Sequence, residues 1–261
     1  LSAPEQINLH KDHVRYEIRK FMRLAASGNP TLIELLWTRA EDHHVVTPEG
    51  EELLAMRTSF LSRRVGDRFG GYALSQLKRI RTHRRWLLHP PTAEPTRRSF
   101  GLPSQRVITK DQEGAARALE EKGIIQQSDL PPNFIGLLNQ ERRYQQKRRE
   151  WEQWRTWVRE RNPQRARLEA EFGYDTKHAM HLIRLLKMAA EILVTGTVQV
   201  WRDDRDELRA IRAGALSYDT LIERAEALQQ EVERACRQSP LPREPNEDDL
   251  NRLCADLVEQ V

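Results

Sequence analysis

Helical periodicity runs through almost the whole chain and limits it to a mainly α fold. In residues 14–26, "VRYEIRKFMRLAA", apolar side chains recur every three or four positions, which is the spacing of one face of an α-helix. The same spacing, with helix-starting and helix-stopping residues around it, predicts further helices. They cover residues 30–37, 47–56, 66–88, 110–122, 137–161, 175–194, 217–236 and 247–260.

Side-chain positions within these segments give more specific predictions. In the 66–88 helix, Tyr72, Leu77 and Ile80 should face the core while the arginines face water. "GTVQV" at 196–200 is the clearest strand candidate, because it is short and rich in β-branched residues.

Proline-rich stretches separate the helices. Residues 89–104, "HPPTAEPTRRSFGLPS", carry four prolines and should form a loop or linker, and "DLPPNFIG" at 129–136 should be a second break. The chain therefore consists of helical segments joined by irregular, proline-rich connections.

Positive charge is concentrated in two segments. The chain as a whole has a formal net charge of +4. Residues 76–98 carry seven Lys/Arg and one acid, and residues 141–168 carry ten and four. Clustered cations attract phosphate groups through a salt-dependent term that does not read sequence, so RNA is a candidate partner.

The two cysteines and the hydropathy of the chain indicate its compartment. Cys236 and Cys254 show no C-x-x-C spacing, so a zinc–cysteine site is not predicted and the thiols should be reduced. No run of 18 apolar residues and no signal peptide is present. We therefore expect a soluble cytoplasmic protein that does not bind membranes.

Residues 174–186, "YDTKHAMHLIRLL", place several cations in the first turns of one helix. With Asp175 as N-cap and about 100° between successive residues, Lys177, His181 and Arg184 fall within about 40° of one line, whereas His178 points toward the apolar side. Cations at the positive end of a helix dipole are unfavourable unless an anion binds there. Two interpretations stay open: a phosphate contact, or a solvated flank beside a hydrogen-bonded core histidine.

Other patterns suggest chemistry only weakly. "DDRDE" at 203–207 clusters acids that suit Mg²⁺, but such a run at the start of a helix also complements the helix dipole. Arg84 and His89 form an R-x4-H pattern compatible with a metal-independent ribonuclease, yet the two prolines after His89 argue against it. The tryptophans of the 141–168 segment can stack bases or anchor a core. Phosphate-binding loops, zinc-protease motifs and nucleophile elbows are absent from the sequence.

Three blocks of the sequence resemble predicted nucleotidyltransferases of the DNA polymerase beta superfamily, in the branch described as RNA-ligase-associated. Residues 160–225, which include "FGYDTKHAMHLIRLL", resemble the C-terminal region of these proteins. "VRYEIRKFMRLAASGNPTLIELLW" at 14–37 and "FGGYALSQLKRI" at 69–80 resemble earlier blocks, in the same order. The resemblance implies the helical C-terminal portion of a polymerase-beta-like enzyme with little residual β structure.

The resemblance also implies a reaction. Such enzymes transfer a nucleoside monophosphate from an NTP to an acceptor hydroxyl, and two Mg²⁺ held by carboxylates assist the transfer. The Gly-Ser turn and D-x-D pair that hold these ions in the family do not occur in this sequence. Glu17 is the first candidate for the third carboxylate of the family, and Asp12 is the second; no other metal ligand is assigned.

Two explanations of this departure stay open, a truncated chain, which the first residue Leu1 favours, or a catalytically inactive relative. In either case we expect little or no transferase activity from this chain alone. The Tyr16–Glu17–Ile18 triplet is strand-like in the family pattern and helical by periodicity, and the sequence alone does not decide between them.

By resemblance, the 174–186 helix supplies the nucleotide contacts. Lys177 and Arg184 would meet the triphosphate of the NTP, and Asp175 would cap the helix and orient Lys177. His178 would contact the phosphates or the acceptor, and His181 would bond a phosphate oxygen or relay a proton. The expected domains are a remainder of the nucleotidyltransferase domain at 1–109, a basic helical connector at 110–172 and a helical C-terminal domain at 173–261. The alternatives are a basic helical RNA-binding module without catalytic activity, and a purely structural helical adaptor.

Overall fold

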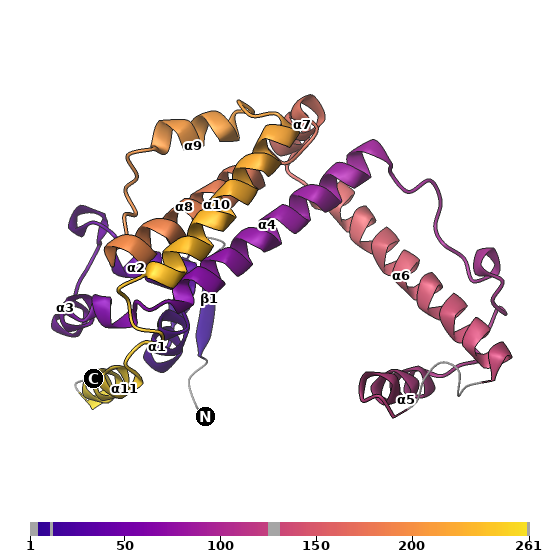
Figure 1. The fold of residues 1–261 in the computed structure, drawn as a ribbon, viewed down its shortest axis with the longest axis horizontal. Helices are drawn as coiled ribbons and strands as arrows, with labels where there is room; N and C mark the ends of the chain where they lie inside the picture. Colours follow the sequence, from indigo (N-terminus) through magenta and orange to yellow (C-terminus); the bar gives the residue numbers. More distant parts are fainter. Residues whose placement is uncertain (1–4, 11–12, 125–130, 260–261) are drawn as a thin grey trace. The chain divides into compact units, whose positions relative to one another are not determined.

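A computed structural model describes residues 5–10, 13–124 and 131–259, and it confirms the mainly α prediction (Figure 1). Within these residues the only strands are β1 (Gln6–His10) and β2 (His13–Tyr16), which pair antiparallel. The α-helices are α1 (Ile18–Ala26), α2 (Pro30–Leu36), α3 (Pro48–Ala55), α4 (Arg64–Leu88), α5 (Lys110–Glu121), α6 (Pro132–Glu160), α7 (Pro163–Phe172), α8 (Thr176–Thr195), α9 (Arg205–Arg212), α10 (Tyr218–Gln238) and α11 (Glu247–Glu259). Three short 3-10 helices complete the set: η1 (Ala40–Asp42), η2 (Arg57–Phe60) and η3 (Arg98–Phe100).

The chain forms two compact units. The larger unit combines residues 1–84 with residues 167–261, and the smaller unit consists of residues 85–166. The smaller unit therefore interrupts the larger one in sequence. The functional domains expected from the sequence end at residues 109 and 172, whereas the compact units divide after residues 84 and 166. The functional division stays a prediction.

Helix α8 is the centre of the larger unit. Ten of its residues are buried, among them Leu182, Ile183 and Leu193, which are almost fully inaccessible. The Asp175 side chain caps its N-terminus, and Gly196, with a positive φ of 67°, ends it as glycine commonly does. Burial on several faces explains why apolar residues of α8 are spread over more than one side of the helix.

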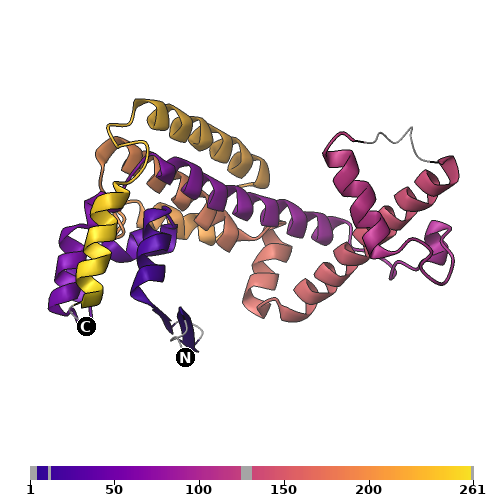
Figure 2. The ribbon, with the colours of Figure 1, turned by 90° about the horizontal axis from the view of Figure 1, so that it is seen from below.

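Three helices pack around α8 in the larger unit (Figures 1 and 2). α9 and α10 make the most extensive contacts with it. α4 runs antiparallel to it, because Gly66 at the start of α4 approaches Leu193 near the end of α8, while Gln76 contacts His178 near its start. At one end of the unit, α11 packs against α1 (Figure 2).

The predicted 14–26 helix is partly wrong. Val14 lies in β2 and is exposed, and the helix begins only at Ile18. Glu17 caps α1 by accepting a hydrogen bond from the Lys20 amide at 3.1 Å. The Tyr16–Glu17–Ile18 triplet is therefore a strand-to-helix junction. The strand pattern applies up to Tyr16, and the helical pattern applies from Ile18 onward.

Three other predictions need correction. "GTVQV" does not form a strand. Gly196 caps α8, Val198 is buried, and the sheet formed by the described residues contains only β1 and β2. Tyr72 is 43% exposed rather than inward, and its hydroxyl accepts a hydrogen bond from Asn29, whereas Leu77 and Ile80 are buried as predicted. The break expected at 129–136 does not extend past Pro131, because α6 begins at Pro132.

The smaller unit has its own small core. Ile108, Ala116 and Leu138 are buried there, so α5 packs on the first part of α6. Beside this core, Arg97 donates two hydrogen bonds to the buried Glu141 carboxylate at 3.0 and 2.9 Å. Burial alone would raise the pKa of Glu141, but the Arg97 hydrogen bonds outweigh it and hold that pKa below its usual value.

Among the described residues, no helix combines the length and the apolar character that crossing a bilayer requires.

Candidate functional site

The N-terminus of α8 is held by contacts from three parts of the larger unit. Arg84 of α4 donates a hydrogen bond to the Gly173 carbonyl at 3.0 Å, and its guanidinium lies 4.1 Å from the centre of the Tyr218 ring. The buried Tyr174 hydroxyl donates to the Leu216 carbonyl at 2.7 Å. These contacts fix the first turn of α8, and they give Arg84, the arginine of the R-x4-H pattern, a structural role.

Asp175 and His178 meet two side chains of α4 in what we call the His–Asp cluster, formed by Gln76, His83, Asp175 and His178. Asp175 is 1% exposed, and its carboxylate accepts from the His178 backbone amide at 3.0 Å. Its second oxygen, Oδ2, lies 3.4 Å from His178 Nε2 and 4.0 Å from His83 Nδ1. On the other side of the His178 ring, Nδ1 lies 2.7 Å from Gln76 Oε1.

The capping role predicted for Asp175 is therefore present, and its carboxylate is directed toward two histidine rings. His178 leans inward as its helical position predicts. The two histidine rings are tilted by 55° with centroids 5.9 Å apart, so they share the cluster without stacking.

Lys177, His181 and Arg184 form what we call the cationic flank, on the neighbouring face of α8. All three are half-buried. Among the described residues, Lys177 makes no hydrogen bond or ion pair, and it lies in the first turn of α8, where the helix dipole adds positive charge. Of the three, Lys177 is the cation best placed to receive an anion.

Arg184 is engaged within the protein. Its guanidinium forms an ion pair and hydrogen bond with Glu34 of α2. Burial raises the pKa of Glu34, and Arg184 partly offsets that effect. A triphosphate contact by Arg184 would therefore require Glu34 to give up its partner.

A second polar group, here called the Arg202 network, joins the middle of α8 to α9. The buried Arg202 donates to both oxygens of Glu191 at 2.6 and 2.7 Å and to both oxygens of Asp204 at 2.7 and 3.1 Å. Lys187 donates to Asp204 at 2.8 Å. Although burial opposes it, these hydrogen bonds lower the pKa of Asp204 to about 2.

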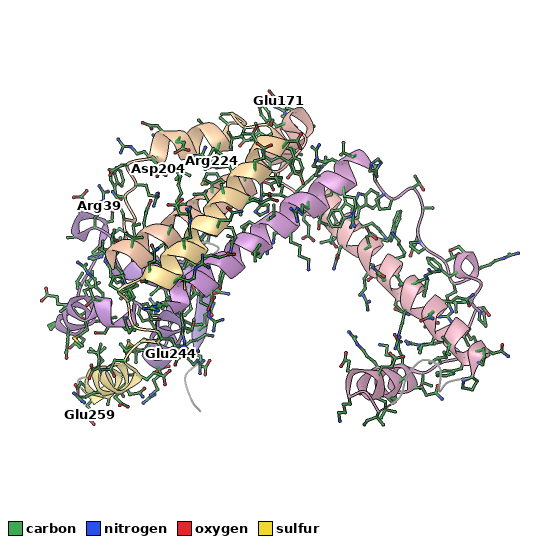
Figure 3. All side chains as sticks on the ribbon, in the orientation of Figure 1. Arg39, Glu171, Asp204, Arg224, Glu244 and Glu259 are labelled. Atoms are coloured by element: carbon green, nitrogen blue, oxygen red, sulfur yellow. The ribbon has the colours of Figure 1, made fainter. Side chains whose placement is uncertain are left out.

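The network extends to α10. Glu207 accepts from Lys187 at 2.6 Å and pairs with Arg224. Figure 3 labels Asp204, the residue before α9, and Arg224 of α10. The 203–207 acids considered for Mg²⁺ are thus largely neutralised by cations of the protein itself.

The carboxylates that the resemblance implies for Mg²⁺ do not converge. Glu17 caps α1, pairs with Arg19 at 3.5 Å, and lines a pocket of about 480 Å³ between α1, α3 and α11. Asp12 lies outside the described residues. Within the described ranges, the only group of three or more His, Cys, Asp or Glu ligands brought together is His83, Asp175 and His178. The described residues therefore do not fit a two-Mg²⁺ site, which needs several carboxylate oxygens.

The tryptophans of α6 pack on neighbours within the smaller unit. Trp151 and Trp154 contact each other with ring centroids 4.9 Å apart, and Trp157 lies 5.4 Å from the buried Trp86. Arg161 covers the Trp157 ring at 4.5 Å. Such packing is typical of anchors and leaves the exposed arginines as the accessible feature of this helix.

Sequence reasoning missed Gln76 and His83. Both lie on α4, seven residues apart, so they share one helical face with the buried Ile80. Polar residues on the apolar face of a helix are a signal of a buried polar site, and they would have marked this position.

Comparison with known families supports one part of the resemblance. The sequence model of the family described as "RlaP: RNA repair pathway DNA polymerase beta family" matches residues 4–89, a third of the chain. This stretch includes the 14–37 and 69–80 blocks, and it carries Glu17, Glu34, Gln76 and His83. Comparison with curated proteins and with solved structures gave no match. Residues 4–89 thus resemble a polymerase-beta-like nucleotidyltransferase family, and the 160–225 block lies outside the match.

Proposed function

We propose that this chain is the helical, nucleotide-contacting part of a polymerase-beta-like nucleotidyltransferase, which transfers a nucleoside monophosphate from an NTP to an acceptor hydroxyl on nucleic acid. The family match over residues 4–89 carries the proposal. α4 from the matched stretch packs on α8, so the cationic flank belongs to the same compact unit as the matched residues.

In this proposal Lys177 is the main contact to the triphosphate, because it is the flank cation without an internal partner among the described residues. Arg184 holds Glu34 and contributes positive potential nearby. His181 lies one turn along α8 from Lys177 and would bond a phosphate oxygen. Glu17, the family's candidate catalytic carboxylate, is placed at the start of α1, and Mg²⁺ would need ligands beyond those the described residues bring together.

Replacing Lys177 with alanine is expected to weaken NTP binding by the 261-residue chain about tenfold to a hundredfold. This is the affinity change that corresponds to the loss of one hydrogen bond to a charged group. The measurement is equilibrium binding of a fluorescent ATP analogue at low salt. Lys78→Ala, which removes an exposed lysine of α4, is the matched control and should bind like the wild type. Equal affinities for wild type and Lys177→Ala would contradict the proposed role.

An RNA-binding module without catalysis is the second candidate, and the charge of the smaller unit favours it. Residues 85–166 contain 16 Lys/Arg and 10 Asp/Glu, whereas the larger unit carries more acids than bases. On α6, Arg143, Arg149 and Arg155 are exposed and make no ion pair with any described residue. Exposed, unneutralised arginines are the side chains that contact a phosphate backbone.

Changing Arg143, Arg149 and Arg155 together to glutamine is expected to reduce the salt dependence of RNA binding. Each lost phosphate contact removes about 0.7 from the slope of log affinity against log salt for a single strand, so the slope should fall by about 2. The measurement is fluorescence anisotropy with a labelled single-stranded RNA at several salt concentrations, without NTP. A Lys147→Gln variant, which removes a lysine already paired with Glu150, is the control. An unchanged slope in the triple variant would exclude this surface.

A further inference from the structure

We propose that His83, Asp175 and His178 bind one divalent transition-metal ion of the Zn²⁺ class. One ligand atom from each residue lies within 4.8 Å of the other two. A zinc ion with bonds of about 2.0–2.2 Å would bring such atoms together through small side-chain rotations. Two imidazoles and one carboxylate are a donor set suited to d-block ions rather than to Mg²⁺, which prefers oxygen ligands.

The hydrogen bond between Gln76 and His178 supports this assignment. With the Gln76 carbonyl oxygen 2.7 Å from Nδ1, His178 donates its Nδ1 proton there. The other ring nitrogen, Nε2, then faces Asp175 Oδ2 at 3.4 Å, so both atoms point toward one position. A metal ion at that position would be bound by both atoms.

The same hydrogen bond matches the usual surroundings of metal-binding histidines. Such histidines donate their second ring N–H to a carbonyl or carboxylate, which fixes the tautomer and the ring orientation. Gln76 performs this role for His178 from the facing helix α4.

The exposure of the three side chains also fits a metal site that keeps one coordination position open to solvent. The Asp175 side chain is 1% exposed, whereas the side chains of His83 and His178 retain 16% and 14% exposure. Three protein ligands leave a fourth position for water or for an oxygen of a ligand, as in catalytic zinc sites.

The test is isothermal titration of the chelator-treated 261-residue chain with ZnCl₂. The wild type should bind one Zn²⁺ per chain. Asp175→Asn removes the charge but keeps an oxygen that caps α8, so it should fold and lose more than about 100-fold in affinity, as should His178→Gln. Gln76→Ala should retain the site with affinity about tenfold lower. His89→Gln, which changes an exposed histidine, should bind like the wild type.

Co²⁺ substitution supplies a second readout on the wild type alone. Nitrogen and oxygen ligands in a four-coordinate site should give visible d–d bands without a thiolate charge-transfer band, which separates this site from binding at Cys236 or Cys254. The proposal is overturned if the folded wild type binds no stoichiometric Zn²⁺, or if Asp175→Asn and His178→Gln bind it unchanged. Lys177→Ala should keep full Zn²⁺ affinity, so the outcome is independent of the nucleotide-binding test.

Discussion

Replacing Arg202 with alanine is expected to lower the free energy of unfolding by about 3 kcal/mol, the lower end of the range for breaking a buried ion pair. Arg202 is 7% exposed and is the only described residue that donates to both Glu191 and Asp204. Without it, the carboxylates of Glu191 and Asp204 lie side by side, and Lys187 is the one described cation left to neutralise Asp204. The remaining exposure of Glu191, whose side chain is 40% accessible, keeps the expected loss at this lower end.

Chemical denaturation followed by near-UV circular dichroism measures the loss. Arg209→Ala, which breaks an exposed pair with Asp206, is the matched control and should change stability by less than about 0.5 kcal/mol. The network lowers the pKa of Asp204 from 3.8 to about 2. The stability that ionised Asp204 adds to the folded state is therefore complete above pH 3.8 and is lost as the pH falls toward about 2. The difference between wild type and Arg202→Ala should shrink over that interval. A difference that stays constant there would show that Arg202 stabilises the fold by packing alone.

Gly214→Ala is expected to destabilise the larger unit by about 2–4 kcal/mol, from a strained backbone together with overpacking. Gly214 follows α9 with a φ of +92°, a conformation that residues with a Cβ rarely adopt. An added Cβ would lie 2.4 Å from the Phe172 ring at the end of α7. Phe172 would have to move, and it lies directly before the residues that Arg84 and Leu216 hold at the start of α8.

Gly71→Ala is the control for this substitution because it has the opposite expected sign. Gly71 is exposed within α4, and nothing lies within 4 Å of its added Cβ, so alanine should stabilise the helix by about 0.5–1 kcal/mol. Thermal unfolding of both variants at one pH decides the comparison. Equal or raised stability of Gly214→Ala would show that Phe172 does not restrict this turn.

Local signals in the sequence predict the helices well. Asn29 before Pro30, Thr47 before Pro48, Ser217 and Asp175 all act as N-caps, because their side chains supply the oxygen that the first free amides need. The errors occur where the outcome depends on distant partners. The segment around Val198 has the β-branched composition of a strand, but no described strand lies beside it to complete a ladder, and Val198 packs into the helical core instead.

The candidate site is only half visible in the sequence for a related reason. Asp175 and His178 lie one turn apart, so periodicity alone places them together. Gln76 and His83 join them only through the antiparallel packing of α4 on α8, about a hundred residues away along the chain. The pairing of Arg184 with Glu34 is equally long-range, and it changes which cation of the flank is available to a ligand.

The interruption of the larger unit by residues 85–166 has a consequence for biosynthesis. α4 is complete on the ribosome long before α8, the helix that covers its apolar face, has been translated. At about 5–20 residues per second, the intervening segment takes roughly 4–16 seconds to synthesise. During that interval Phe69, Ala73 and Ile80 have no partner from the C-terminal half, so the apolar face of α4 stays exposed until α8 has been translated.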